Sequence, residues 1–238
     1  MGVYMSLELS PQRLAGMIDH TFLKPYGTPD DITALCDEAR RYGFAMVAVN
    51  PAEVEHCARL LAGSPVRVGA AVGFPLGQNT AAVKAYEIRD ALARGAAEID
   101  MVINIRALQA GEAALVRAEI ADLAAACRQA GAISKVILET CYLTDAQKDL
   151  VCQMALAEGA DFVKTSTGFG PAGATVEDVR RMRQVVGPQM GVKAAGGIRT
   201  LAAAQAMIAA GATRIGTSAG VAIMQELAQL AAQGGTRL

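Results

Sequence analysis

The sequence predicts a single-domain (β/α)8 barrel of the TIM type with an extra N-terminal helix. Apolar segments typical of strands alternate with longer helical stretches along the whole chain. Strict alternation of strand and helix indicates a parallel sheet. Eight such units fit into 238 residues, and barrels of this size are commonly one domain. No linker rich in proline or serine divides the chain, so we expect one domain over residues 1–238.

Eight short apolar segments have the composition of buried strands. The predicted strands span residues 17–23, 44–50, 66–74, 97–104, 134–140, 161–165, 191–196 and 213–218. The alternative fold is a doubly wound open sheet, but no GxGxxG motif follows the first predicted strand. Eight strand–helix units in this length therefore favour the closed barrel.

Capping residues mark where several of the intervening helices begin and end. Thr28, Thr144 and Thr175 each precede an acidic or amide residue by three positions, which is the capping-box pattern. Ser10 followed by Pro11 predicts a helix ahead of the first strand. Glycines that fit the left-handed residue at a helix end are Gly43, Gly95, Gly131, Gly159 and Gly211.

Composition excludes several classes of protein. The chain is 53% hydrophobic and 19% charged, which suits a large core and excludes disorder. The net charge of -1 gives no reason to expect nucleic acid or an anionic membrane as a partner. We find no apolar stretch of membrane-spanning length and no secretory signal pattern, so we expect no membrane span.

The five cysteines and two histidines do not suggest a metal site. No cysteine pair has CxxC spacing, so neither a zinc site nor a disulfide framework is indicated. Free cysteines in a chain of this length suit a reducing compartment, and we expect a cytoplasmic protein. We expect no metal and no cofactor.

Two lysines stand in apolar strands that run directly into glycine. Lys164 lies in DFVKTSTGFG and Lys193 in GVKAAGG, at matching heights on adjacent strands. Burial and a second nearby cation both disfavour the ammonium form, so one of the two is expected to be a neutral amine that attacks carbonyl groups. The alternatives are an ion-paired core lysine for Lys164 and a structural lysine for Lys193.

Asp100 is the acidic residue inside the apolar stretch IDMVIN. It is positioned to pair with either lysine and to move protons, and the alternative is a purely structural ion pair. Asp19 and Thr21 end the first strand, where Asp19 is a candidate for organising the site. His20 lies between them, and we expect a hydrogen-bonded spacer rather than a general base.

Glycine-rich breaks follow the last three strands. Gly196 and Gly197 end strand seven, and Ser218 lies in the glycine-flanked loop after strand eight. Loops after strands seven and eight commonly hold phosphate in barrels. Gly168 and Gly170, which follow the hydroxyl of Thr167, add a third wall. The alternative is that these glycines only permit tight turns.

Three further charged residues are less informative. Lys135 and Asp161 begin their strands, so we expect both to face the bottom of the barrel and to serve stability. Glu139 ends the fifth strand, and its role stays open.

At this point the chain resembles the deoxyribose-phosphate aldolase family. The resemblance rests on motifs spread from about residue 14 to residue 222, namely IDHTFLKP, VAVNPAEV, VGFPLG, EIDMVINI, KVILETCYLT, FVKTSTGFGPAGAT, VKAAGGIRT and RIGTSAG. VKTSTGFG followed by VKAAGGI is the most specific part. The shorter motifs alone would not suffice.

The resemblance implies reversible cleavage of 2-deoxy-D-ribose 5-phosphate to D-glyceraldehyde 3-phosphate and acetaldehyde. It implies a class I mechanism without metal, in which Lys164 forms the Schiff base, Lys193 lowers its pKa and Asp100 relays protons. Gly168, Gly196, Gly197 and Ser218 match phosphate-binding positions. The partners are then a small sugar phosphate and an aldehyde, and a homodimer is compatible with the sequence.

This chain departs from some relatives at a few positions. Ala48 stands where some carry cysteine, and Phe169 stands where some carry lysine. Phosphate binding is therefore expected to rely more on backbone amides. The chain ends in GGTRL without the tail tyrosine of some relatives, so closure of the tail over the site is not expected.

Two other functions stay open at this stage. One is a different Schiff-base barrel aldolase, such as a transaldolase or a keto-acid aldolase. The other is a barrel that binds sugar phosphates without turnover.

Overall fold

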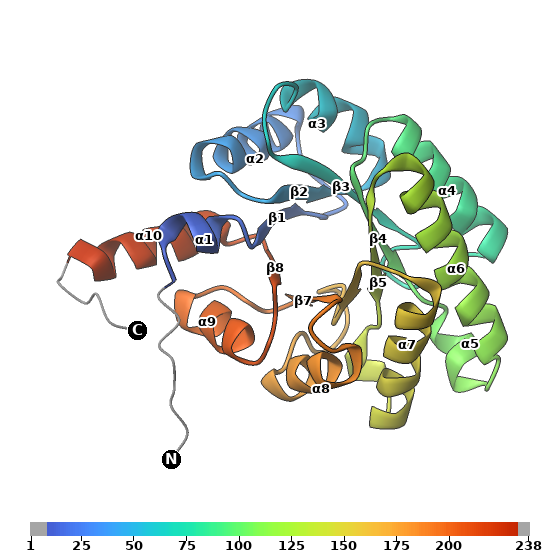
Figure 1. Cartoon of the computed structure of the whole chain (residues 1–238). Helices are drawn as coiled ribbons and strands as arrows, with labels where there is room; N and C mark the ends of the chain where they lie inside the picture. Colours follow the sequence, from blue (N-terminus) through green and yellow to red (C-terminus); the bar gives the residue numbers. More distant parts are fainter. Residues whose placement is uncertain (1–8, 233–238) are drawn as a thin grey trace, which may run out of the picture.

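The computed structural model describes residues 9–232, and its eight strands form a closed parallel barrel in the order β1 to β8 (Figure 1). Eight strands were predicted, and all eight are present within two or three residues of the predicted bounds at most ends. They are β1 (Ile18–Phe22), β2 (Met46–Val49), β3 (Arg67–Val72), β4 (Glu98–Val102), β5 (Ile133–Ile137), β6 (Phe162–Lys164), β7 (Gly191–Ala195) and β8 (Arg214–Thr217).

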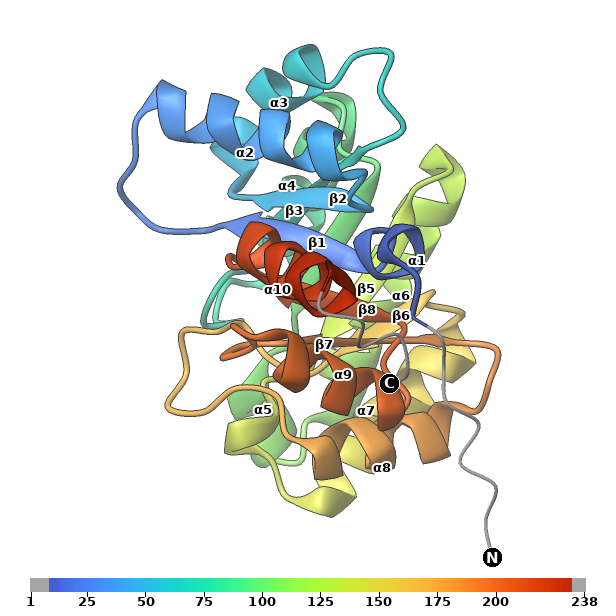
Figure 2. The same ribbon diagram turned by 90° about the vertical axis from the view of Figure 1, so that its left-hand side faces the viewer.

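The helices surround the barrel and separate its strands from solvent (Figures 1 and 2). They are α1 (Pro11–Ala15), α2 (Pro29–Tyr42), α3 (Val54–Leu60), α4 (Ala81–Ala93), α5 (Ile105–Gln109), α6 (Ala113–Ala130), α7 (Asp145–Glu158), α8 (Val176–Val186), α9 (Leu201–Ala209) and α10 (Gly220–Ala232). Two 3-10 turns, η1 (Pro51–Glu53) and η2 (Thr140–Tyr142), follow β2 and β5. The predicted extra helix is α1, which packs beside α10.

Local sequence signals set the helix ends as predicted, with one difference. The capping boxes at Thr28 and Thr144 are both complete. Thr175 accepts a hydrogen bond from the backbone N–H of Asp178, but the reciprocal side-chain bond is missing. The Asp178 carboxylate instead binds the ammonium of Lys148 at 2.6 Å. All five predicted glycines have positive φ angles, which a residue without Cβ adopts at little cost.

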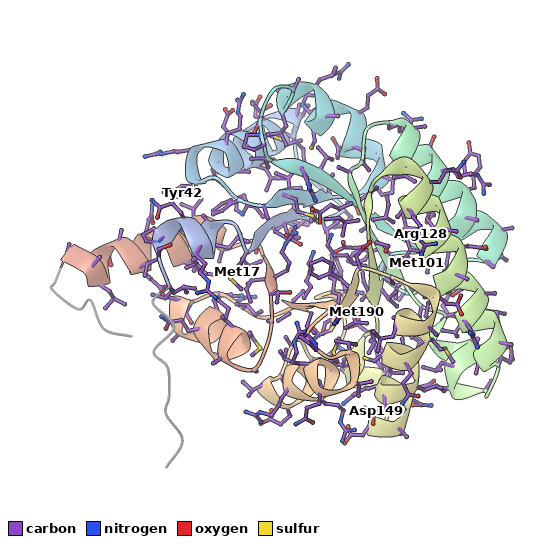
Figure 3. The ribbon with its side chains drawn as sticks, in the orientation of Figure 1. Met17, Tyr42, Met101, Arg128, Asp149 and Met190 are labelled. Carbon is purple, nitrogen blue, oxygen red and sulfur yellow. The ribbon has the colours of Figure 1, made fainter. Side chains whose placement is uncertain are left out.

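Apolar side chains fill the space between strands and helices, as the dense layer of sticks in Figure 3 illustrates. The strands are buried on both faces, which is typical of a parallel sheet covered by helices. Inside the barrel, however, several side chains are charged, and these build the site described below. No helix within residues 9–232 is both long and apolar enough to cross a membrane. The C-terminal GGTRL lies outside the described residues.

Candidate active site

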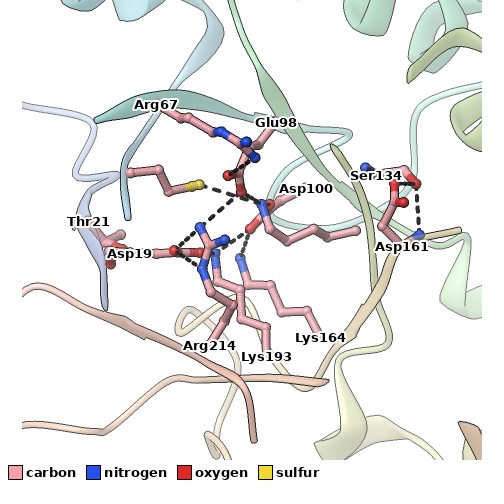
Figure 4. Close-up of polar contacts among 12 residues, drawn as sticks. Asp19, Thr21, Arg67, Glu98, Asp100, Ser134, Asp161, Lys164, Lys193 and Arg214 are labelled. Carbon is pink, nitrogen blue, oxygen red and sulfur yellow. Dashed lines mark hydrogen bonds and ion pairs between the residues drawn. The ribbon is translucent and has the colours of Figure 1, made fainter. Parts of the chain in front are cut away.

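Lys164 and Lys193 lie side by side inside the barrel. The parallel pairing of β6 with β7 places them directly opposite each other in the register, as predicted from their positions. Their exposed fractions are only 3% and 1%. Both ammonium groups point toward the same carboxylate (Figure 4). The tertiary structure therefore joins two residues that are 29 positions apart (193 − 164) in one buried site.

Asp100 on β4 is that carboxylate. Its Oδ2 accepts hydrogen bonds from Nζ of Lys164 at 2.8 Å and of Lys193 at 2.7 Å. Its Oδ1 accepts from Nζ of Lys135 at 2.8 Å. Burial works to raise the pKa of Asp100, but the three lysines outweigh burial and hold the pKa well below its usual range. Asp100 is therefore ionised and holds the two candidate lysines together.

A second layer of charges lies on the other side of the lysines. Asp19 forms an ion pair with Lys193 at 2.5 Å and accepts a hydrogen bond from Nε of Arg214 at 2.7 Å. Glu98 accepts from Nη2 of Arg214 at 3.0 Å and also binds the ammonium of Lys135. Asp19 and Glu98 are fully buried. The layer thus connects β1, β4, β5, β7 and β8 through hydrogen-bonded charges.

The charges of this network balance without Lys164. Among the described residues, three buried carboxylates (Asp19, Glu98 and Asp100) face three cations with strong pairing (Lys135, Lys193 and Arg214). Lys193 has two carboxylate partners, whereas Lys164 has a single one, which it shares. A protonated Lys164 would therefore be an excess positive charge in a buried region, where unpaired charge is costly.

The pKa of Lys164 reflects this imbalance. Burial lowers the pKa most, the Asp100 carboxylate works to raise it, and the cation of Lys193 lowers it further, with a result of about 8. The ordinary value is 10.5. At pH 7 about a tenth of the Lys164 side chains then carry a neutral, nucleophilic amine.

The prediction that Lys135 faces the bottom of the barrel, away from the site, is wrong. Lys135 is the middle residue of β5, and its ammonium lies inside the barrel, where it binds Asp100 and Glu98. Burial works to lower its pKa, and the carboxylates of Asp100, Glu98 and Asp19 raise it. Asp161 does stay at the bottom, where its carboxylate accepts hydrogen bonds from the backbone and hydroxyl of Ser134 at 2.8 and 2.7 Å (Figure 4).

A cavity of about 490 Å³ opens at the carboxyl ends of the strands, and Lys164 lies in its wall. This volume suits a small metabolite. Lys193, Asp100 and Asp19 do not line it. The predicted binding residues that do line it are Thr21, Thr167, Gly168, Gly196, Gly197 and Ser218. Of the two lysines, Lys164 is therefore the one that lines the cavity.

The glycine-rich loops of the cavity approach each other closely. Gly168, Gly196 and Gly197 have φ angles of +87°, +90° and +80°, which L side chains rarely adopt. A Cβ on Gly173 would lie 2.1 Å from the carbonyl oxygen of Gly196, so the loop after β6 needs glycine there. The backbone N–H of Ala174 donates to Ala195 and Gly196. These loops therefore need glycine for two reasons, the positive φ angles and the close approach of one backbone to the other.

Three of the predicted polar residues have their polar groups occupied within the protein. Asp19 is used by Lys193 and Arg214, and the hydroxyl of Thr21 donates to the carbonyl of Asp19 at 2.9 Å. The hydroxyl of Thr167 donates to Glu139 and accepts from the N–H of Phe169. His20 and Glu38 also line the cavity, and Nε2 of His20 bonds with the Glu38 carboxylate at 2.7 Å.

Sequence reasoning missed part of the network, although a signal for it exists. Glu98 and Asp100 are two positions apart on β4, so they share one face of the strand. Lys135 is paired with Asp100 in the register of β4 and β5. Arg214 begins β8 inside an apolar segment, as the lysines do. Lys24 and Arg199 are two exposed cations that line the cavity, and neither lies inside an apolar strand segment that would have drawn attention to it.

Within residues 9–232, no group of three or more histidine, cysteine, aspartate or glutamate residues is arranged to hold a metal ion. The three buried carboxylates of the charge network, Asp19, Glu98 and Asp100, have lysine or arginine partners instead. The chemistry that this arrangement supports is attack by an amine on a carbonyl group, next to a chain of proton-carrying side chains.

Comparison with known proteins points in the same direction. Residues 13–226 match the family model described as DeoC/LacD family aldolase. The chain is 64% identical over 222 residues to a deoxyribose-phosphate aldolase of Bacteroides thetaiotaomicron, with 93% of each chain covered.

Solved structures give the same result. A putative deoxyribose-phosphate aldolase from Coccidioides immitis has a TM-score of 0.88 at 39% identity, over 94% of this chain and 91% of that one. The aldolase of Aeropyrum pernix, described as a tetramer, has a TM-score of 0.87 at 35% identity, over 93% of both chains.

Proposed function

The chain belongs to the DeoC/LacD family of aldolases, and from this premise we propose that it is a deoxyribose-phosphate aldolase. The reaction is the reversible cleavage of 2-deoxy-D-ribose 5-phosphate into D-glyceraldehyde 3-phosphate and acetaldehyde. The observation that carries the proposal is the amine of Lys164, which lines the cavity and has a pKa of about 8. No other buried lysine of the charge network reaches the cavity within the described residues.

Lys164 acts as the nucleophile in this proposal. Its neutral amine attacks the aldehyde carbon C1 of the open-chain sugar, and loss of water leaves a protonated imine. The C2–C3 bond then breaks while the C3 hydroxyl loses its proton, and the bond electrons move toward the imine nitrogen. D-Glyceraldehyde 3-phosphate leaves, C2 takes up a proton, and water releases acetaldehyde and the free amine. The imine is needed because a positively charged nitrogen accepts those electrons better than a carbonyl oxygen does.

Asp100 and Lys193 are proposed to support this chemistry. Asp100 holds both lysines by one oxygen, so its carboxylate lies within hydrogen-bond distance of the amine that loses protons as the imine forms. Its pKa lies well below the usual range, so Asp100 is ionised at rest and in this proposal carries a proton only in passing. Lys193 keeps two carboxylate partners and places a cation beside Lys164. We assign Asp19 to organising Lys193 rather than to contact with substrate.

The far end of the cavity is proposed to hold the phosphate. Gly168, Gly196, Gly197 and Ser218 line the cavity, and backbone amides of such glycine-rich loops bind phosphate well. Phe169 lines the cavity and packs edge-on against Phe74, with ring centroids 5.3 Å apart. Its side chain is uncharged and therefore adds no positive charge for a phosphate. Anchoring the phosphate fixes the aldehyde end of the sugar near Lys164.

Reductive trapping tests this function. The protein is treated with acetaldehyde and borohydride, and peptide masses are searched for an ethyl group on Lys164; deoxyribose 5-phosphate is then used in the same way. Pyruvate, the substrate type of keto-acid aldolases, is the parallel probe. Lys164→Arg is expected to lose the adduct and turnover while keeping its circular dichroism spectrum. Lys148→Met, which removes an ion-paired lysine on α7, should keep both.

The outcomes separate the alternatives. An adduct from pyruvate but none from acetaldehyde would favour a keto-acid aldolase. Phosphate-sugar binding without any adduct would favour a binding protein without turnover. Aldol cleavage retained by Lys164→Arg would contradict the assignment of the nucleophile.

Location and assembly stay predictions. We propose a cytoplasmic enzyme that forms a homodimer, and a solution mass measurement decides between the dimer and a tetramer like that described for the Aeropyrum pernix relative.

A further inference from the structure

Glu139 has an unusual backbone and an unusual environment. It is the one residue other than glycine with a positive φ in residues 9–232, at φ 55° and ψ 64°. Left-handed backbone is costly for glutamate and persists where surrounding contacts fix it. The side chain is 2% exposed, although it ends in a carboxyl group. Such a combination calls for a specific role.

The backbone around Glu139 forms a bulge at the end of β5. The N–H of Leu138 donates to the carbonyl of Lys164, and the N–H of Thr140 donates to the carbonyl of Thr165. From Leu138 to Thr140 the chain advances by two residues, whereas the facing carbonyls of Lys164 and Thr165 are one residue apart. Glu139 is the additional residue. Bulges of this kind redirect a side chain and are common at barrel rims near active sites.

The redirected carboxylate holds the loop that follows Lys164. One oxygen accepts a hydrogen bond from the backbone N–H of Thr167 at 3.2 Å, and the other accepts from the hydroxyl of Thr167. The same hydroxyl accepts from the N–H of Phe169 at 3.0 Å. Gly168, a wall of the cavity, lies between these two anchored residues.

The loop also lies directly on Glu139. A Cβ on Gly170 would be 3.3 Å from the Glu139 carboxyl carbon and 3.0 Å from Sγ of Cys141. Cys141 in turn donates weakly to Glu139, at 3.9 Å. Glu139 therefore packs against residues 167–170 and holds their backbone in place.

We propose that Glu139 is a positioning residue for the phosphate of the substrate and acts through Thr167 and Gly168. This inference rests on the proposed function for the identity of the ligand. Glu139 does not line the cavity and does not touch Lys164, Lys193 or Asp100. It is expected to affect affinity for the phosphate group and to leave the chemistry at Lys164 unchanged.

Glu139→Gly separates the backbone from the carboxylate, because glycine adopts the left-handed conformation freely and provides no hydrogen-bond acceptor. Two quantities are measured on the purified protein. The first is the dissociation constant of inorganic phosphate, followed by calorimetry and by competition with deoxyribose 5-phosphate. The second is the rate of borohydride trapping of acetaldehyde on Lys164, which involves no phosphate.

We expect phosphate binding to weaken about tenfold in Glu139→Gly, the effect of one misplaced hydrogen-bond donor, at an unchanged trapping rate. Glu87→Gln is the matched control. Its carboxylate also supports loop backbone, at Gly73 with 2.7 Å, but that loop does not line the cavity. Its phosphate affinity should equal that of the wild type.

A double-mutant cycle tests whether Glu139 acts through Thr167. Thr167→Val removes the hydroxyl, and the double variant should bind phosphate no more weakly than the weaker single variant. Multiplicative losses, an unchanged phosphate affinity in Glu139→Gly, or equal losses of binding and trapping would each overturn the proposal. A wild-type protein without aldol cleavage would refute the proposed function alone, because phosphate binding is measured without turnover.

Discussion

Lys164 and Lys193 differ in their partners, although the sequence presents them as equivalents. Lys193 is paired with both Asp19 and Asp100 and is shut off from the cavity. Lys164 shares Asp100 and faces the cavity. The residue with fewer anionic partners and access to a ligand is the one suited to be an uncharged nucleophile.

Replacing Lys193 with leucine tests this electrostatic division of roles. The change removes a cation that lowers the pKa of Lys164, so that pKa should rise from about 8 by roughly one unit or more. The neutral amine forms only above its pKa, so the rising limb of kcat/KM against pH should move upward by the same amount. At pH 7 the rate should fall at least about tenfold.

The measurement is a pH–rate profile of both proteins, with Lys148→Leu as the control for loss of a lysine far from the site. An unchanged profile in Lys193→Leu would show that Lys193 does not tune the nucleophile.

Among the elements, β4 and the two loops after β6 and β7 position the site. Alternation along β4 directs Glu98 and Asp100 into the barrel. There Glu98 meets Lys135 and Arg214, and Asp100 meets three lysines. The two loops lie backbone against backbone, because glycine at position 173 permits the approach to Gly196. The shape of the proposed phosphate site thus depends on a contact between elements.

Gly173→Ala is expected to separate these loops. The new Cβ would lie 2.1 Å from the carbonyl oxygen of Gly196, so the backbone must move. KM for deoxyribose 5-phosphate should rise about tenfold or more, whereas trapping of acetaldehyde on Lys164 should change little. Steady-state kinetics and trapping rates measure the two effects.

Gly16→Ala is the matched control, because its Cβ would meet its nearest atom at an ordinary 3.4 Å with φ at −65°. A Gly173→Ala enzyme with wild-type KM would refute the importance of this contact.

For the whole molecule, the charged interior links activity to stability. A lysine with a lowered pKa in the folded protein binds fewer protons than it does in the unfolded chain. Folding stability therefore rises with pH between the two pKa values, here about 8 and 10.5. Below this window, protonated Lys164 is an excess buried charge that opposes folding.

Comparison with Lys164→Met should reveal this cost. As pH rises from about 8 to 10.5, the unfolding free energy of the wild type should increase relative to that of the variant, by up to about 3 kcal/mol. Urea unfolding at several pH values measures the difference, in which titration of other groups cancels. A difference that stays constant over this range would show that the pKa of Lys164 is not lowered by folding.

Much of the fold could be predicted because its signals are local. Thr28 and Thr144 form their capping boxes, and the apolar segments around Met46 and Ile99 become strands. The predicted fifth strand extended too far, because Glu139 turns into a left-handed bulge. That bulge depends on Thr167 in another segment, so no local pattern announces it.

The sequence by itself determined the alternation of strand and helix, the places of Lys164 and Lys193 in consecutive strands and the glycine loops that follow them. Each of these features lies within one strand, helix or turn, so residues close together in the sequence are enough to predict it. Only the tertiary structure decided which lysine meets the cavity, that Lys135 and Arg214 belong to the network, and that Glu139 supports the loop of Thr167. Burial, charge balance and contact between distant segments exist only once the barrel has closed.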